Sequence, residues 1–136
     1  MLSSTWALLG YITITALLAL AIPTWRAVLT VFAGRKSNSF TPSGTDISPL
    51  FERVCRAHAN CYENFPLIGG MLILALLTET TQITNALAGY LLAARLLQSI
   101  VHIISTNEVM VTIRFTLYYV QLLIIFSWII KYVQLL

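Results

Sequence analysis

Charged residues are scarce in this sequence of 136 residues. Asp and Glu number 5, Lys and Arg number 8, and charged residues make up 10% of the chain, whereas 58% of it is hydrophobic. Soluble domains contain about a quarter charged residues, and the mean hydropathy here is +0.83. This composition excludes an ordinary soluble domain and predicts an integral membrane protein with a single domain over residues 1–136.

Clusters of basic residues are also lacking. The net charge is +3, but the longest basic run is the pair Arg35 and Lys36, so we expect no nucleic-acid partner. The two cysteines, Cys55 and Cys61, lie roughly 240° apart around one predicted helix and cannot easily form a disulfide. With His58 they spread over about 120° and have no fourth ligand nearby, so we expect no metal site.

Acidic residues are absent from residues 1–33. Small proton-coupled exporters with four helices need a carboxylate in their first helix, so this absence argues against that class. The same stretch lacks the basic start of a secretory signal, and its apolar run from Trp6 to Phe32 is about twice as long as the hydrophobic region of a signal. We therefore expect a spanning helix there, with a kink at Pro23.

Hydropathy predicts four spanning helices, at about residues 5–33, 49–78, 84–105 and 109–134. Ser48 and Pro49 are typical of a helix start, because the serine caps an N–H group and proline loses nothing at the first position. Four spans place both termini on one side. The first loop carries Arg35 and Lys36 and the second has no basic residue, so the positive-inside rule predicts a cytoplasmic first loop and termini on the opposite side.

Polar residues within the predicted helices form stripes at helical spacing, about 80° wide in the second helix. Each charge at the middle of a bilayer costs on the order of 2.5–3.5 kcal/mol, so such stripes indicate contact with protein, water or a ligand. The stripes consist of Glu52, Arg56, Asn60 and Glu63 in the second helix, Arg95, Ser99 and His102 in the third, and Arg114, Tyr118 and Gln121 in the fourth.

Arginines outnumber carboxylates in these stripes. Arg56, Arg95 and Arg114 have Glu63 and, nearer the helix start, Glu52 as candidate partners. Because an unpaired buried charge is costly, the excess predicts an anionic ligand that binds from outside. Two alternatives stay open: Glu52 and Arg56 form a surface pair while the other polar groups make contacts within the bundle, or a lipid headgroup phosphate supplies the anion.

Residues 52–66 read Glu-Arg-Val-Cys-Arg-Ala-His-Ala-Asn-Cys-Tyr-Glu-Asn-Phe-Pro. This segment resembles the helix-two signature of the MAPEG family, the membrane-associated proteins of eicosanoid and glutathione metabolism. The signature is Glu-Arg, two residues, Arg-Ala, two residues, Asn, two residues, Glu, two residues and Pro, and every fixed position is filled. The whole chain is similar to the family in hydropathy, helix count, orientation and length. The resemblance implies an all-α homotrimer of four-helix protomers, with glutathione at the subunit interfaces near the cytosolic side.

The resemblance also implies roles for individual residues. Arg114 resembles the arginine that activates the glutathione thiol, and because arginine stays protonated it would stabilise the thiolate rather than act as a base. Guanidinium groups suit the two carboxylates of glutathione, and Glu63 suits its amine. His102 and Tyr118 have plainer alternatives, as a hydrogen-bonded histidine and a packing aromatic. The expected glutathione-binding residues are Arg53, Arg56, Asn60, Glu63, Arg95, Gln98, His102 and Tyr118.

Departures from the family pattern narrow the expected activity. Members of the eicosanoid pathway commonly have tyrosines where Gln98 and His102 stand, and often an aromatic where Asn64 stands. We therefore expect a microsomal-type or bacterial glutathione transferase or peroxidase that acts on hydrophobic electrophiles or lipid hydroperoxides, in a bacterial inner membrane rather than the endoplasmic reticulum. The alternative is a non-catalytic homologue that binds a lipid or a protein partner.

Overall fold

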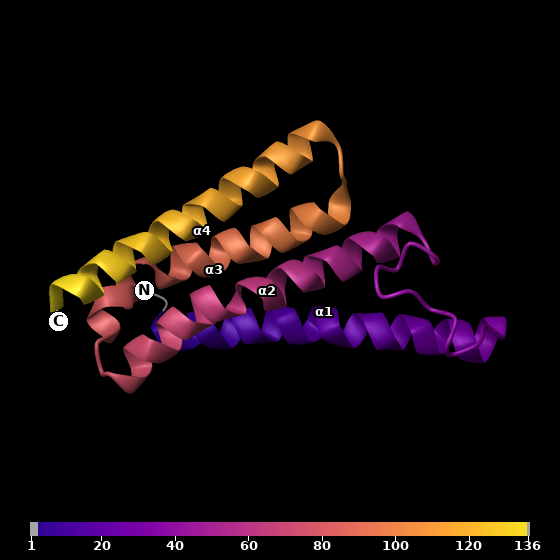
Figure 1. Cartoon of the computed structure of the whole chain (residues 1–136), viewed down its shortest axis with the longest axis horizontal. Helices are drawn as coiled ribbons and strands as arrows, with labels where there is room; N and C mark the ends of the chain where they lie inside the picture. Colours follow the sequence, from indigo (N-terminus) through magenta and orange to yellow (C-terminus); the bar gives the residue numbers. More distant parts are fainter. Residues whose placement is uncertain (1–2, 136) are drawn as a thin grey trace.

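The computed structural model describes residues 3–135, which fold into four α-helices. Figure 1 shows the helices lying side by side. Each is long and apolar enough to cross a membrane, since a span needs about 20 residues. The predicted all-α architecture is confirmed, and the chain has the form of a multi-pass integral membrane protein. The helices are α1 (Ser4–Ala33), α2 (Pro49–Leu77), α3 (Thr81–Ile104) and α4 (Glu108–Leu135).

The ends of the helices follow from local chemistry. The Ser48 side chain accepts a hydrogen bond from the Phe51 N–H at 3.1 Å, and Pro49 occupies the first helical position, as expected from the sequence. α1 ends at Gly34, whose φ of 65° lies in the left-handed region that favours glycine. α1 continues through Pro23 to Ala33, and the kink expected at Pro23 stays a prediction.

α3 begins at Thr81, earlier than the predicted start at residue 84. Hydropathy misses its first turn because that turn is polar. The structure gives this turn a packing role, since the Ser4 and Thr84 hydroxyls lie 2.6 Å apart and the Ser4 N–H donates to Asn85 Oδ1 at 2.8 Å. These hydrogen bonds join the start of α1 to the start of α3.

The helices pack unequally. α2 contacts both α1 and α3, α4 packs mainly on α3, and α1 also contacts α3. Figure 1 shows both termini at one end of the molecule and the first and third loops at the other, while α3 and α4 separate towards the third loop. The predicted arrangement of termini and loops is therefore observed, and which end faces the cytoplasm stays a prediction.

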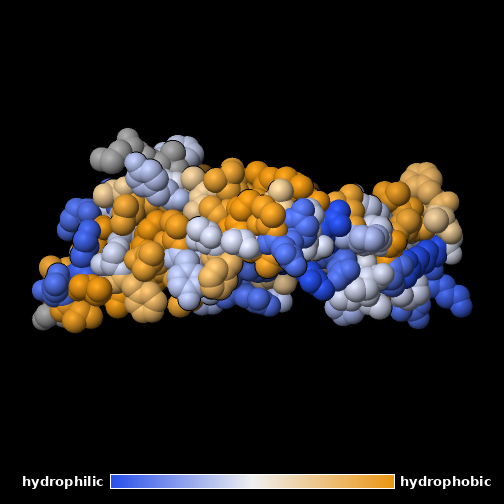
Figure 2. Space-filling view, turned by 90° about the horizontal axis from the view of Figure 1, so that it is seen from above, coloured by the Kyte–Doolittle hydropathy of each residue, from blue (hydrophilic) through white to orange (hydrophobic). Residues whose placement is uncertain are grey.

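The main apolar core lies near the end that holds the termini. It includes Tyr11 from α1, Leu72 from α2, Leu91 from α3 and Trp128 from α4, and none of these four side chains is exposed. Large apolar residues also cover the outside of the bundle, as expected for helices that face lipid. In Figure 2 hydrophilic residues gather at one edge and over much of the half that holds the first loop, and apolar residues cover much of the rest.

The first loop, residues 34–48, is folded against itself. Asp46 accepts a hydrogen bond from the Thr41 hydroxyl at 2.5 Å and forms an ion pair with Arg35. Arg26, in the last part of α1, donates to the Thr41 carbonyl at 2.8 Å. The Arg35 guanidinium also lies 4.5 Å from the centroid of the Phe40 ring. These contacts tie the end of α1 to the approach to α2.

Acidification is expected to open the first loop. The Thr41 hydroxyl bonded to Asp46, together with backbone N–H groups and the Arg35 guanidinium, holds the pKa of that carboxyl below its ordinary value. A carboxyl with a lowered pKa stabilises the folded form above its ordinary pKa, and the contribution is lost as the pH falls through the lowered value. Pepsin cleavage within the loop should therefore accelerate below about pH 4. Asp46→Asn corrects for the pH dependence of pepsin itself, so the ratio of wild-type to Asp46→Asn cleavage should rise as the pH falls. A ratio that stays constant would show that Asp46 does not hold the loop.

Candidate functional site

A pocket of about 400 Å³ lies between α2, α3 and α4. Each helix contributes residues three or four positions apart, because this spacing places side chains on one face of a helix. Six of the predicted site residues meet here, although they come from three separate segments of the chain. The lining consists of Asn60, Glu63 and Asn64 from α2, Gln98 and His102 from α3, and Val111, Arg114, Phe115 and Tyr118 from α4.

Arg114 and His102 make direct contact across the pocket wall. Arg114 Nη1 lies 3.1 Å from His102 Nδ1. A guanidinium group can only donate, so Nδ1 must be the acceptor and the ring proton must sit on Nε2. The two ion pairs among the described residues are Arg35 with Asp46 and Arg56 with Glu52. Arg114 therefore brings a half-buried positive charge to the pocket without a carboxylate partner in residues 3–135.

A chain of amides fixes the wall between α3 and α4. Gln121 Nε2 donates to Gln98 Oε1 at 2.9 Å and to the Leu117 carbonyl at 2.9 Å, and Gln98 Nε2 donates to the Arg114 carbonyl at 3.4 Å. Gln98 and Gln121 are both buried. This chain connects the backbone that carries Arg114 to α3, so Gln98 orients the pocket as well as lining it.

Arg95 lies behind the pocket wall rather than in its lining. Its side chain has no exposed area, its Nη1 donates to Asn60 Oδ1, and its guanidinium lies 5.3 Å from the centroid of the Tyr11 ring. Arg95 Nε and Nη2 have no hydrogen-bond partner within residues 3–135. Arg95 is therefore placed behind Asn60 and outside the pocket lining, and a direct contact with glutathione stays a prediction.

Arg53 and Arg56 also lie outside the pocket lining. Arg56 Nη2 pairs with Glu52 Oε1 at 2.6 Å, and 62% of its side chain is exposed. Arg53 Nε donates to the Ile103 carbonyl at 2.7 Å, close to the end of α3. Both arginines line a separate cavity of about 220 Å³. The surface pair of Glu52 and Arg56, one of the alternatives that the sequence left open, is thus present. Of the three arginines in the polar stripes, Arg95 and Arg114 have no carboxylate partner among the described residues.

Three lining residues were not predicted from the sequence: Asn64, Val111 and Phe115. Asn64 follows Asn60 by four positions and so shares its face of α2, a signal that was present in the sequence. Asn64 Nδ2 donates to the Asn60 backbone carbonyl at 2.8 Å, and the side-chain oxygen of Asn64, Oδ1, is left for a ligand. Val111 and Phe115 carry no polar signal and are recognised only by their neighbours in the folded chain.

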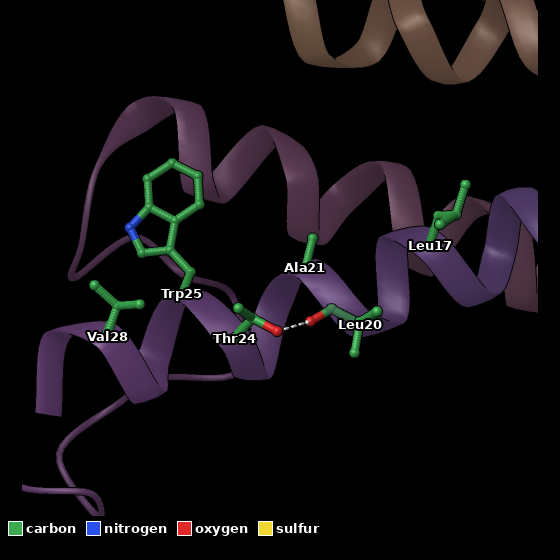
Figure 3. A pocket seen from close by; sticks show the side chains of 6 residues that line it. All are labelled: Leu17, Leu20, Ala21, Thr24, Trp25 and Val28. Atoms are coloured by element: carbon green, nitrogen blue, oxygen red, sulfur yellow. Dashed lines mark hydrogen bonds between the residues drawn. The ribbon is translucent and has the colours of Figure 1, made fainter. Parts of the chain in front are cut away.

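A groove along α1 has a volume of about 540 Å³ but a different chemistry. Figure 3 shows its six lining side chains, and all of them belong to α1. The Thr24 hydroxyl donates to the Leu20 carbonyl at 2.7 Å, and the lining has no charged residue. Such a groove suits a lipid chain or apolar side chains. It offers nothing to the carboxylates or the amine of a charged tripeptide.

Comparisons with known proteins bear on this arrangement. A profile of the MAPEG family matches residues 6–133, nearly the whole chain. Neither a comparison with curated proteins nor one with solved structures finds a match. The family match includes nearly all of the four helices and every residue of the pocket. The chain belongs to the MAPEG family.

Proposed function

We propose that this protein is a membrane-bound glutathione transferase that binds glutathione in the pocket between α2, α3 and α4. The observation that supports the proposal most is Arg114, a cation without a carboxylate partner in the described chain, beside a pocket of about 400 Å³. This volume lies within the roughly 300–1,000 Å³ of small-molecule sites. The thiol of glutathione becomes reactive as a thiolate. This anion would be the negative partner that Arg114 does not have within the described residues.

The proposed chemistry is activation of the glutathione thiol. Arg114 stabilises the thiolate, whose sulfur attacks an electrophilic carbon; a C–S bond forms and the leaving group departs with the electron pair of its bond. With a lipid hydroperoxide the sulfur instead takes the terminal oxygen and releases an alcohol, and a second glutathione then gives the disulfide and water. One cation at about 4 Å with an effective dielectric near 20 provides roughly 4 kcal/mol before desolvation, against 1.36 kcal/mol per pKa unit. Lowering the thiol pKa by about two units is within this range.

The remaining polar residues suit the rest of the tripeptide. Glu63 is the one carboxylate in the pocket lining and can pair with the amine of glutathione. Asn60, Asn64 and Tyr118 offer amide and hydroxyl groups to its peptide bonds. Arg56 lies one helical turn before Asn60, so an extended tripeptide reaches it if a glutathione carboxylate replaces Glu52 as its partner, and Arg53 lies in the same cavity.

We also propose that the protein works as a homotrimer with its first loop in the cytoplasm, in a bacterial inner membrane. Family membership supports the trimer, and so does the open side of the pocket, where Glu63 is exposed in the single chain. A neighbouring protomer on this side would shield Glu63 from lipid. The basic residues of the first loop support the orientation.

Substitution of Glu63 tests the proposed binding mode. In Glu63→Gln the amine of glutathione loses a charged partner, and a hydrogen bond to a charged group contributes about 1.5–3 kcal/mol. KM for glutathione should therefore rise about 10- to 100-fold in conjugation of a chloronitrobenzene by the purified protein. Glu79→Gln is the matched control, because Glu79 lies between the end of α2 and the start of α3, in the loop at the end of the molecule that holds the termini. An unchanged KM in Glu63→Gln would remove Glu63 from the site.

A second candidate function is a non-catalytic homologue that binds a lipid or a partner protein. The apolar groove along α1 favours it, since its lining suits a lipid chain. Such a protein would bind without turnover. Calorimetry with glutathione beside the conjugation assay separates the two candidates: glutathione binding together with conjugation supports the transferase, and lipid binding without conjugation supports the alternative.

A further inference from the structure

Within this proposed transferase site, on which the inference rests, we propose that His102 is a positioning residue whose neutral ring holds Arg114 in place through Nδ1. The inference gives His102 a role distinct from that of a ligand to glutathione or a general base. It rests on the contact between the two side chains and on the chemistry of their nitrogen atoms.

The contact fixes the tautomer of His102. Arg114 Nη1 lies 3.1 Å from Nδ1, and because arginine always donates, Nδ1 must carry a lone pair. The ring proton therefore lies on Nε2. With Nδ1 occupied by the guanidinium and Nε2 already protonated, neither nitrogen is free to take a proton from a thiol. The geometry thus excludes His102 as the base while Arg114 is bound to it.

Arg114 is held at two points, its backbone and its side chain, which makes the contact a defined one. Gln98, one turn before His102 on α3, donates to the Arg114 carbonyl at 3.4 Å and is itself held by Gln121. The backbone of Arg114 is therefore tied to α3 by an amide and its side chain by an imidazole. Two anchors on one helix leave the long arginine side chain little freedom to swing out of the pocket.

A second proton on His102 would break this arrangement. The imidazolium has no lone pair, so Arg114 would lose its acceptor and face a positive charge about 3 Å away. The charged and titratable groups that face His102 are Arg114 and Tyr118 on α4, Glu63 and Arg56 on α2, and Arg95 on its own helix. Three of these groups are arginines and Glu63 is the only carboxylate, so the surroundings of His102 favour its neutral ring and with it the contact to Arg114.

Two substitutions separate positioning from base catalysis. His102→Asn keeps an acceptor at the place of Nδ1 but cannot act as a base, and His102→Leu removes both properties. Misplacing a catalytic group can cost about 100-fold in rate. We expect kcat/KM to fall about 10- to 100-fold in His102→Leu and less than about threefold in His102→Asn. His58→Asn is the matched control, because His58 packs on Tyr62 with ring centroids 5.3 Å apart. Equal losses in both His102 variants, or no loss in either, would overturn the proposal.

The pH profile tests whether the ring of His102 stays neutral. Between about pH 8 and pH 5 the glutathione thiol loses its charge in every variant. His102→Asn cannot gain a proton at residue 102, so a neutral His102 predicts that the ratio of wild-type to His102→Asn activity stays constant over this range. A ratio that falls with the pH would show that the ring is protonated and releases Arg114, and would contradict the proposal.

The tautomer can be measured without any catalytic assay. The chain has two histidines, so ¹⁵N-histidine labelling of the His58→Asn protein leaves His102 as the only signal. We expect an unprotonated Nδ1 and a protonated Nε2 at neutral pH, and loss of this preference in Arg114→Met. A proton on Nδ1 would overturn the inference whether or not the protein is active. If the protein shows the expected tautomer but does not conjugate glutathione, the contact between His102 and Arg114 is supported and the proposed function is contradicted.

Discussion

Arg114→Met is expected to lower kcat/KM for glutathione conjugation by about 100- to 1,000-fold, the cost of removing one preorganised group that stabilises an anion. Methionine retains much of the length of the side chain and removes its charge. The chain has no other cation in the pocket lining, so nothing replaces the lost charge. Without it the glutathione thiol keeps its ordinary pKa of about 8.5 and is mostly protonated at neutral pH.

The loss in Arg114→Met should shrink as the pH rises. Above about pH 9 the thiol ionises without help, so the variant recovers part of its rate while the wild type, already mostly thiolate, gains little. The ultraviolet absorbance of bound thiolate provides a second measurement at neutral pH. Lys36→Met is the control, since it removes an exposed cation of the first loop. Equal thiolate absorbance in wild type and Arg114→Met would show that another group activates the thiol.

The lining of the pocket could be predicted from the helical period, because the period determines which residues of one helix share a face. His102 lies four positions after Gln98 and Tyr118 four after Arg114, so each pair had to share a face once its helix formed. Polar faces of spanning helices turn towards protein or water, and this brought the stripes of α2, α3 and α4 together. The sequence was sufficient to predict six lining residues, although it contains no direct information on the distance between helices.

How deeply each arginine side chain is buried in the protein could not be predicted in the same way. Arg56, Arg95 and Arg114 each belong to a polar stripe, yet one is largely exposed, one is fully buried and one lines the pocket. Depth depends on the rotation and separation of neighbouring helices, which the period of a single helix does not determine. Arg95 is buried because Tyr11 from α1 covers it, a contact between residues 84 positions apart.

The fold separates the end that provides stability from the end that holds the site. The core around Trp128 and Leu72 lies near the termini, whereas the pocket lies nearer the third loop, where α3 and α4 diverge. The divergence leaves room for a ligand without opening the core. It also implies that stability and ligand binding can be changed independently by substitutions at the two ends.

Trp128→Ala is therefore expected to destabilise the protein strongly while leaving the pocket intact in the folded fraction. Trp128 is completely buried in the core that includes Leu72, Ala88 and Leu91. Removing a buried tryptophan costs about 3–5 kcal/mol, because the side chain loses its packing contacts and leaves a cavity. The free energy of unfolding, measured by denaturation of the protein in detergent micelles, should fall by this amount.

Trp6→Ala is the matched control, because it makes the same change on α1 at a side chain that is 63% exposed. Its loss should stay within about 0.5 kcal/mol, since no packed cavity forms at such a site. Trp128→Phe should cost less than Trp128→Ala, because the ring still fills much of the space and the buried indole Nε1, which has no partner in the described chain, is removed. Similar losses for Trp6→Ala and Trp128→Ala would contradict this assignment of the core, since lipid contact and internal packing would then contribute equally.

Because the pocket and the core lie at different ends, folded Trp128→Phe should bind glutathione as the wild type does, and a weaker affinity would show that the two ends are coupled through α3 and α4.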